Sequence, residues 1–180
     1  MRLLFGLLLV CLAIPPGLVA QEPGRPFVGV HAGTALILGD SIHASTVGFS
    51  GRLTGGLQLR GRIGLEASAQ YGTGWKDHDV LVPQLPVAFD LYGGTLAGVM
   101  ELRMASRPVR LRLGAGGYRV RASPQVAPDV TVLGLEAGIE VVTGKWPRGR
   151  FLLGVRPLLL PNVHGELVWL IPVELGIRLW

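Results

Sequence analysis

The sequence has little cysteine, little lysine and little charge. Cys11 is the one cysteine among 180 residues, and it lies in an apolar segment at the N-terminus. A disulfide framework and thiol chemistry are therefore excluded for the rest of the chain. Charged residues make up 16% of the chain and hydrophobic residues 49%, which excludes a polar disordered segment.

The basic residues do not form the stripe that nucleic-acid binding requires. Lys76 and Lys145 are the only lysines among 17 basic residues, and the arginines are scattered one or two at a time, although the formal net charge is +5. We therefore expect no nucleic-acid partner. Beyond residue 20 no apolar run reaches the 18 or more residues of a spanning helix. The 27 glycines and 13 prolines disfavour helices and divide the chain into short apolar runs, which favours an all-β fold.

The N-terminus has the organisation of a secretory signal peptide. Arg2 precedes an apolar core at residues 3–14, Pro15 and Pro16 break that core, and Ala20 provides a small residue for cleavage before Gln21. We predict a signal peptide at residues 1–20 and one β-barrel domain at residues 21–180.

The last stretch of the chain has the clearest strand pattern. Leu167 and every second residue from there to Leu179 are apolar, whereas the other face carries Glu174, Gly176 and Arg178. Strict alternation indicates a strand with one apolar and one polar face. The same pattern predicts eight strands, at residues 27–38, 52–60, 63–71, 87–104, from 109, 130–143, 151–160 and 167–180.

Long and short connections alternate between these strands. The long ones are residues 39–51, 72–86 and 122–129, followed by a shorter one at 161–166; the turns are residues 60–62, 105–108 and 144–149. This pattern is typical of an eight-stranded antiparallel up-and-down transmembrane β-barrel. A soluble β-sandwich or barrel with solvated charges is the alternative.

The polar face predicts a narrow, sealed interior. It is rich in glycine, as expected where eight strands leave little space inside. Charges buried there would need partners, so we expect a lumen charge network that plugs the barrel. Its predicted members are Glu66, Arg110, Arg112, Glu136, Glu140, Arg156, Glu174 and Arg178. The aromatic residues, Phe27 and Trp75 among them, are expected to form two belts at the membrane interfaces.

Together these features resemble the small eight-stranded outer-membrane proteins of diderm bacteria, the group that contains the OmpA transmembrane domain and the OmpX-like and OmpW-like barrels. The resemblance covers the whole chain and concerns architecture. In that family the terminal aromatic usually shares the outward face, whereas Trp180 is one residue out of step with Leu179. The resemblance implies an outer-membrane location after signal cleavage. It also implies outer-membrane lipids, including lipopolysaccharide, and the barrel assembly machinery as partners, with a monomer as the default.

Candidate chemistry is sparse, and we expect no enzyme activity, cofactor or metal. The loop residues 76–79, which include His78, are interpreted as a solvated cluster rather than a metal or acid–base site. His43 and Ser45 have the His-x-Ser spacing of an outer-membrane lipid A deacylase, without an identifiable carboxylate to orient the imidazole. His31 is expected to be a hydrogen-bonded interior residue. The favoured function is a structural or surface-interaction barrel; the alternatives are a narrow channel for small or apolar solutes and, less favoured, a lipid-modifying enzyme.

Overall fold

A computed structural model describes residues 26–39, 47–60, 62–77, 87–104, 107–123, 128–163 and 165–180. All of its regular structure in those ranges is β-strand. The strands are β1 (Pro26–Gly39), β2 (Val47–Arg60), β3 (Ile63–Asp77), β4 (Val87–Met104), β5 (Arg107–Ser123), β6 (Val130–Trp146), β7 (Gly149–Val155), β8 (Leu158–Val163) and β9 (Glu166–Leu179).

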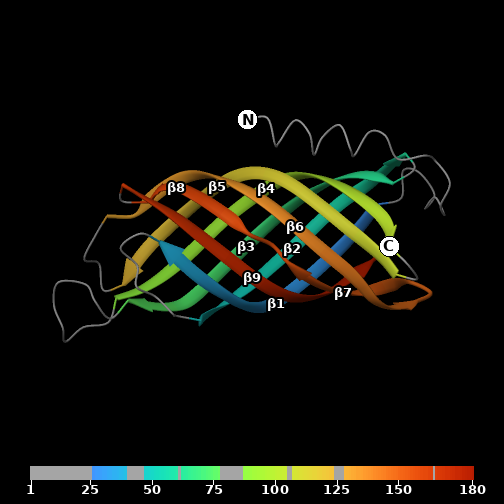
Figure 1. Ribbon diagram of the computed structural model, residues 1–180, viewed down its shortest axis with the longest axis horizontal. Coiled ribbons are helices and arrows are strands. Elements are labelled where there is room, and N and C mark those ends of the chain that lie inside the picture. Colours follow the sequence, from blue (N-terminus) through green and yellow to red (C-terminus); the bar gives the residue numbers. More distant parts are fainter. Residues whose placement is uncertain are drawn as a thin grey trace.

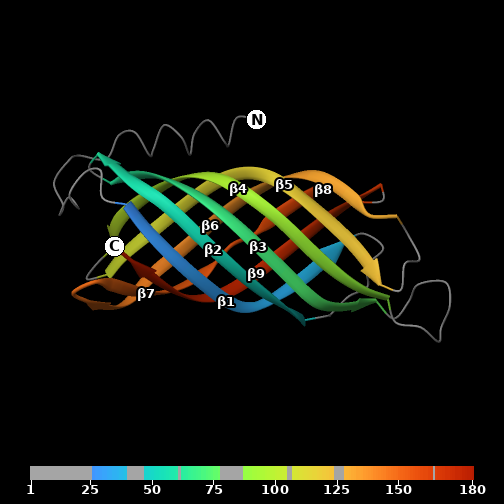
Figure 2. The same cartoon turned by 180° about the vertical axis from the view of Figure 1, so that it is seen from behind.

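The strands form one closed antiparallel ring. From β1 to β7 each strand pairs with the next along the chain, β7 and β8 both pair with β6 and β9, and β9 pairs with β1 to close the sheet. Figures 1 and 2 show the result as a long cylinder crossed by tilted strands. Closure leaves no unpaired edge among these strands. The prediction of an all-β, up-and-down barrel is confirmed.

The nine strands occupy eight positions around the ring, because β7 and β8 continue one another. The predicted seventh strand, residues 151–160, is interrupted at Arg156 and Pro157. Ala137 N donates to Pro157 O at 3.0 Å, and Arg156 N donates to Pro172 O at 3.0 Å. Neither proline has an N–H to complete the pair, so each removes one bond from the ladder. The register does not change across the break.

Side chains alternate between the outside and the lumen as predicted. In β9, Val173, Leu175 and Ile177 are 44%, 67% and 43% exposed, whereas Glu174 and Arg178 are buried. The outward face of the ring is therefore aliphatic and the inward face polar over much of its length, which reverses the usual arrangement of a water-soluble protein.

Two strands are longer than the sequence pattern predicts, and the connections next to them are correspondingly shorter. β2 begins at Val47 rather than at residue 52, and β3 continues to Asp77 rather than ending at residue 71. A bulge allows β3 to continue, because the pairing with β4 shifts between Gly72 and Trp75 and Gly74 has a φ of +88°. A side chain at Gly74 would disfavour that left-handed conformation. The predicted linkers at residues 39–51 and 72–86 are therefore partly strand.

Both described chain ends lie at the end of the barrel that carries the short turns. Val28 pairs with Leu179 there, and the turns between β2 and β3, β4 and β5, and β6 and β7 lie at the same end. We call this the turn end and the opposite one the loop end. The predicted signal peptide lies outside the described residues. In the part of the chain that the structure describes, no helix is long and apolar enough to cross a membrane.

Candidate functional site

The eight charged residues predicted for the lumen all point into the barrel. Each of them is at most 4% exposed. They come from β3, β5, β6 and β9 and from the break between β7 and β8. The structure thus brings these side chains together from five of the eight positions in the ring: Glu66, Arg110, Arg112, Glu136, Glu140, Arg156, Glu174 and Arg178.

Arg52 is the centre of this cluster, and sequence reasoning missed it. Its guanidinium donates to Glu140 Oε1 at 2.8 Å, to Glu174 Oε2 at 3.1 Å and to Glu66 Oε1 at 3.3 Å. The residue is 3% exposed. A signal existed in the sequence, because Arg52 has the same parity in β2 as the inward-facing Thr54. We include Arg52 in the lumen charge network from here on.

The other arginines of the network share the same carboxylates. Glu66 accepts from Arg110 at 3.0 Å and also from Arg112, and Glu136 accepts from Arg112 and Arg156. Each carboxylate therefore serves two or more guanidinium groups, the arrangement that keeps buried charges compensated. The same chain of contacts continues into Glu174, which accepts from Arg156 at 3.2 Å.

His31 lies inside the lumen next to the central arginine, as the alternation in β1 predicts. Arg52 Nη2 lies 3.1 Å from His31 Nδ1, and the same ring nitrogen lies 3.9 Å from Glu140. Gly176 on the neighbouring strand β9 pairs directly with His31, and an added Cβ there would overlap the imidazole. The histidine thus occupies space that a glycine on β9 leaves free.

Two aromatic residues expected in the interface belts point inward instead. Phe27 is 8% exposed, and the Arg178 guanidinium lies over its ring at 4.1 Å from the centroid, a cation–π contact. Trp75 is 1% exposed, and its indole N–H donates to Ala35 O at 3.0 Å. The bulge at Gly74 changes which residues of β3 face inward, so a simple alternation cannot locate Trp75.

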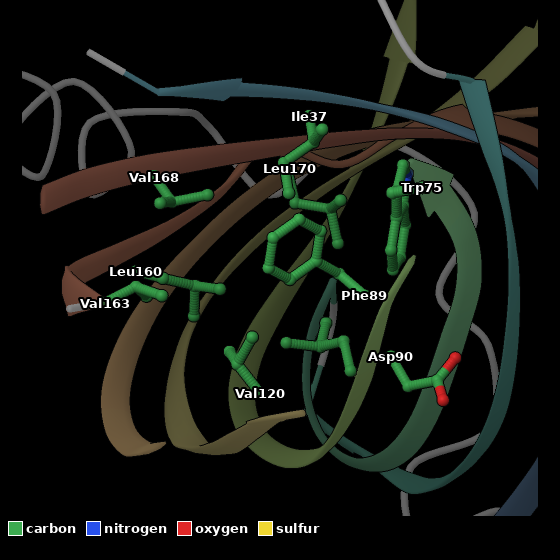
Figure 3. A pocket seen from close by; sticks show the side chains of 10 residues that line it. Ile37, Trp75, Phe89, Asp90, Val120, Leu160, Val163, Val168 and Leu170 are labelled. Carbon is green, nitrogen blue, oxygen red and sulfur yellow. The ribbon is translucent and has the colours of Figure 1, made fainter. Parts of the chain in front are cut away.

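The lumen changes character toward the loop end, where its lining becomes apolar. There the inward side chains of six strands surround a pocket, shown in Figure 3. We call this the apolar pocket, and its lining residues are Ile37, Trp75, Phe89, Asp90, Leu91, Val120, Leu160, Val163, Val168 and Leu170. The sequence carries a trace of this region, since residues 167–170 are apolar on both faces.

Tyr118 marks the boundary between the two parts of the lumen. Its ring is 1% exposed and packs in the apolar cluster, while its hydroxyl is hydrogen-bonded to Thr95 Oγ1. Thr95 Oγ1 in turn lies 3.3 Å from Glu136 Oε2, a member of the charge network. The lumen therefore consists of a charged section and an apolar section joined at this hydroxyl pair.

The remaining candidate residues gain no support from the described part of the chain. His43, Ser45 and His78 lie outside the described residues. Among the residues that the structure does describe, no group of His, Cys, Asp and Glu side chains is placed to hold a metal ion.

Trp180 extends beyond β9 and does not take part in the outward aliphatic face. It is half-buried, and its backbone N–H donates to Arg148 O at 3.3 Å. The Arg150 guanidinium lies over its indole ring at 4.9 Å from the centroid. These contacts attach the final aromatic to the turn between β6 and β7. They account for its different parity, because it packs on the turn end of the barrel rather than along its side.

No protein-family model matches the chain, and no curated protein matches its sequence. Solved structures are similar in fold. The Neisserial surface protein A is 19% identical, with a TM-score of 0.66 over 86% of this chain and 96% of that one. The attachment invasion locus protein Ail of Yersinia pestis is 16% identical, with a TM-score of 0.55 over 87% and 99%. The outer-membrane protein OprG of Pseudomonas aeruginosa is 14% identical, with a TM-score of 0.50 over 89% and 99%. The chain therefore has the fold of the small eight-stranded outer-membrane barrels.

Proposed function

We propose that the chain is a non-enzymatic outer-membrane β-barrel whose lumen is closed by its own side chains. Its role would be structural or interactive, exercised through its loop end. The observation that carries the proposal is the reversed burial of the barrel: aliphatic side chains cover the outside, and paired charges fill the inside.

The exposed outer face supports a place in a lipid bilayer. Leu96, Leu133 and Leu175 are 67%, 78% and 67% exposed and come from three different parts of the ring. In water a band of such side chains would be a large aggregation-prone patch, whereas hydrocarbon matches it. The ring also satisfies its backbone groups by closing on itself, as a spanning sheet must.

The fold and the N-terminal pattern together favour the outer membrane. Small antiparallel barrels with short turns at one end and longer loops at the other are typical of that membrane, and the similar structures include outer-membrane proteins. In this arrangement the turn end faces the periplasm, and the loop end faces the lipopolysaccharide leaflet. Lipids and the assembly machinery would be its partners, with a monomer as the working unit.

The ion pairs support a lumen without a continuous water path. Arg52 on β2 reaches Glu140 on β6, and these strands lie on opposite sides of the ring. Arg110 bonds to the same Glu140 and to Glu66 on β3. Side chains therefore cross the barrel from several directions. The cluster of buried apolar residues fills the part of the lumen toward the loop end.

Conductance in planar bilayers tests the closed lumen. We expect no steady single-channel currents from purified protein, while electrophoresis without boiling shows the shifted band of a folded barrel. Steady currents would contradict the closed lumen and favour the narrow-channel alternative.

Incubation with lipopolysaccharide tests the absence of enzyme activity: a change in acylation that disappears in His43→Ala would contradict a purely structural role.

A further inference from the structure

The apolar pocket has the composition of a binding site for hydrocarbon. It has a volume of about 30 Å³ and lies between β1, β3, β4, β5, β8 and β9 at the loop end. Phe89 projects into its centre, as Figure 3 shows, and Trp75 forms one wall. Leu158 and Tyr118, both 1% exposed or less, belong to the buried cluster beside it.

The few polar groups around this pocket are already engaged. The indole N–H of Trp75 is taken by Ala35 O. The Asp90 carboxylate accepts from Thr73 Oγ1 at 2.5 Å and points away from the apolar side chains in Figure 3. A water molecule inside would find no free partner among these groups. Cavities of this kind exclude water and accept apolar molecules.

We propose that the apolar pocket binds the end of an alkyl chain, as carried by a single-chain amphiphile whose polar head stays at the loop end. The small volume admits only the terminal carbons of a chain rather than a bulky ring system. The charge network beneath prevents such a chain from passing further, because hydrocarbon would have to displace paired ions. The barrel would thus hold a ligand without conducting it, which goes beyond the function proposed above.

Trp75 provides a reporter for this binding. Single-tryptophan variants keep either Trp75 or the outward Trp169, with the other tryptophans replaced by Phe, and are kept soluble in amphipathic polymer instead of detergent. Straight-chain 1-alkanols brominated at the terminal carbon serve as probes, since bromine quenches a tryptophan that it touches. We expect saturable quenching for Trp75, with apparent affinity rising about fourfold per added methylene until the pocket is full. For Trp169 we expect weak quenching that rises linearly with the concentration of the brominated alkanol.

Two substitutions of the same type separate pocket binding from adsorption on the barrel. Val168 is 2% exposed and lines the pocket, whereas Val173 on the same strand is 44% exposed to the outside. We expect Val168→Phe to abolish saturable quenching and Val173→Phe to leave it unchanged. If Val168→Phe fails to fold, Phe89→Ala provides the test, since the enlarged pocket should extend the affinity gain to longer chains.

A second arm distinguishes a free amphiphile from a membrane lipid. In nanodiscs of phosphatidylcholine brominated on its acyl chains, quenching of Trp169 alone indicates that the occupant is a free single-chain molecule. Quenching of both tryptophans indicates that a bilayer lipid supplies the chain.

The proposal is overturned if Trp75 is quenched linearly and no more than Trp169, if affinity does not depend on chain length, or if folded Val168→Phe binds normally. Any of these results would leave the closed membrane barrel intact.

Discussion

At the scale of single residues, the charge network depends unequally on its members. Arg52 contacts Glu66, Glu140 and Glu174, so one side chain compensates three buried carboxylates on three strands. Its side chain is 1% exposed, so bulk water has little access to these charges. Removing one partner from buried pairs is far more destabilising than removing an exposed pair, because the charges that remain are uncompensated.

Replacing Arg52 by alanine should therefore destabilise the barrel strongly. We expect Arg52→Ala to lower the free energy of unfolding by about 3–5 kcal/mol, measured by urea unfolding in lipid vesicles. Arg119→Ala is the matched control, because Arg119 also bonds to a carboxylate, Asp129, but its side chain is 62% exposed. That substitution should cost at most about 1 kcal/mol. Equal effects of the two changes would contradict a central role for Arg52.

The alternation of residues identified the charges inside the lumen but not the way they are connected. Parity alone placed Glu66 and Arg112 on the inward face, since a strand offers only two faces. It could not show that Arg52 reaches across to β6, because this contact depends on how the ring closes. It also failed for Trp75, where a bulge inserts a residue and reverses the parity that follows.

At the scale of elements, β4 and β5 form the longest regular ladder, with unbroken pairing from Ala88 to Met104. Two neighbouring glycines in β5 differ sharply in their surroundings. An added Cβ at Gly116 would collide with the backbone of Gly94 on β4, whereas one at Gly117 would meet nothing within 4 Å. The close approach of the two strands thus depends on one glycine and not on the next.

We expect Gly116→Ala to prevent or severely weaken folding, because the two backbones would have to separate. Gly117→Ala should be tolerated or slightly stabilising, since alanine restricts the unfolded chain and has space outside the barrel. The fraction of protein that shows the band shift of an unboiled sample, together with urea unfolding, measures both effects. A folded Gly116→Ala with unchanged stability would show that the strands do not approach so closely.

The prolines explain where the strand prediction differed from the structure. The alternation of Phe151, Leu153 and Val155 with Gly154 and Arg156 predicts one strand over residues 151–160. The common register of β7 and β8 agrees with one position in the ring. Pro157 and Pro172 remove ladder bonds on both sides of Arg156, which ends β7 early. Conversely, β2 is longer than predicted because Gly48 and Gly51, which resemble turn residues in sequence, lie within regular pairing, and β3 is longer because its pairing with β4 resumes after the bulge at Gly74.

At the scale of the whole molecule, the ring is closed by the pairing of the first strand with the last. Val30 lies opposite Ile177, and both side chains face outward at 61% and 43% exposure. This pairing could be anticipated from an even number of antiparallel strands, but its register could not be derived from the sequence. The apolar pocket was likewise beyond sequence reasoning, since it arises from residues of six strands that meet only in the closed barrel.

A disulfide should form across the closure if this register is right. In a chain with Cys11→Ser, we expect Val30→Cys with Ile177→Cys to cross-link under mild oxidation, because opposite residues of an antiparallel pair are within disulfide reach. The cross-linked chain would migrate differently from the reduced chain after boiling. The control, Val30→Cys with Leu133→Cys on β6, should remain reduced within each molecule. Failure of the first pair to cross-link in folded protein would contradict the closure.

The contact between Glu174 and Arg52 joins side chains 122 positions apart in the chain. Arg52 on β2 therefore lacks this carboxylate partner until the final strand joins the sheet. Until that strand docks, Arg52 and Arg156 both lack Glu174, and the interior carries more positive than negative charge. The strand that completes the wall thus also completes the charge balance of the interior.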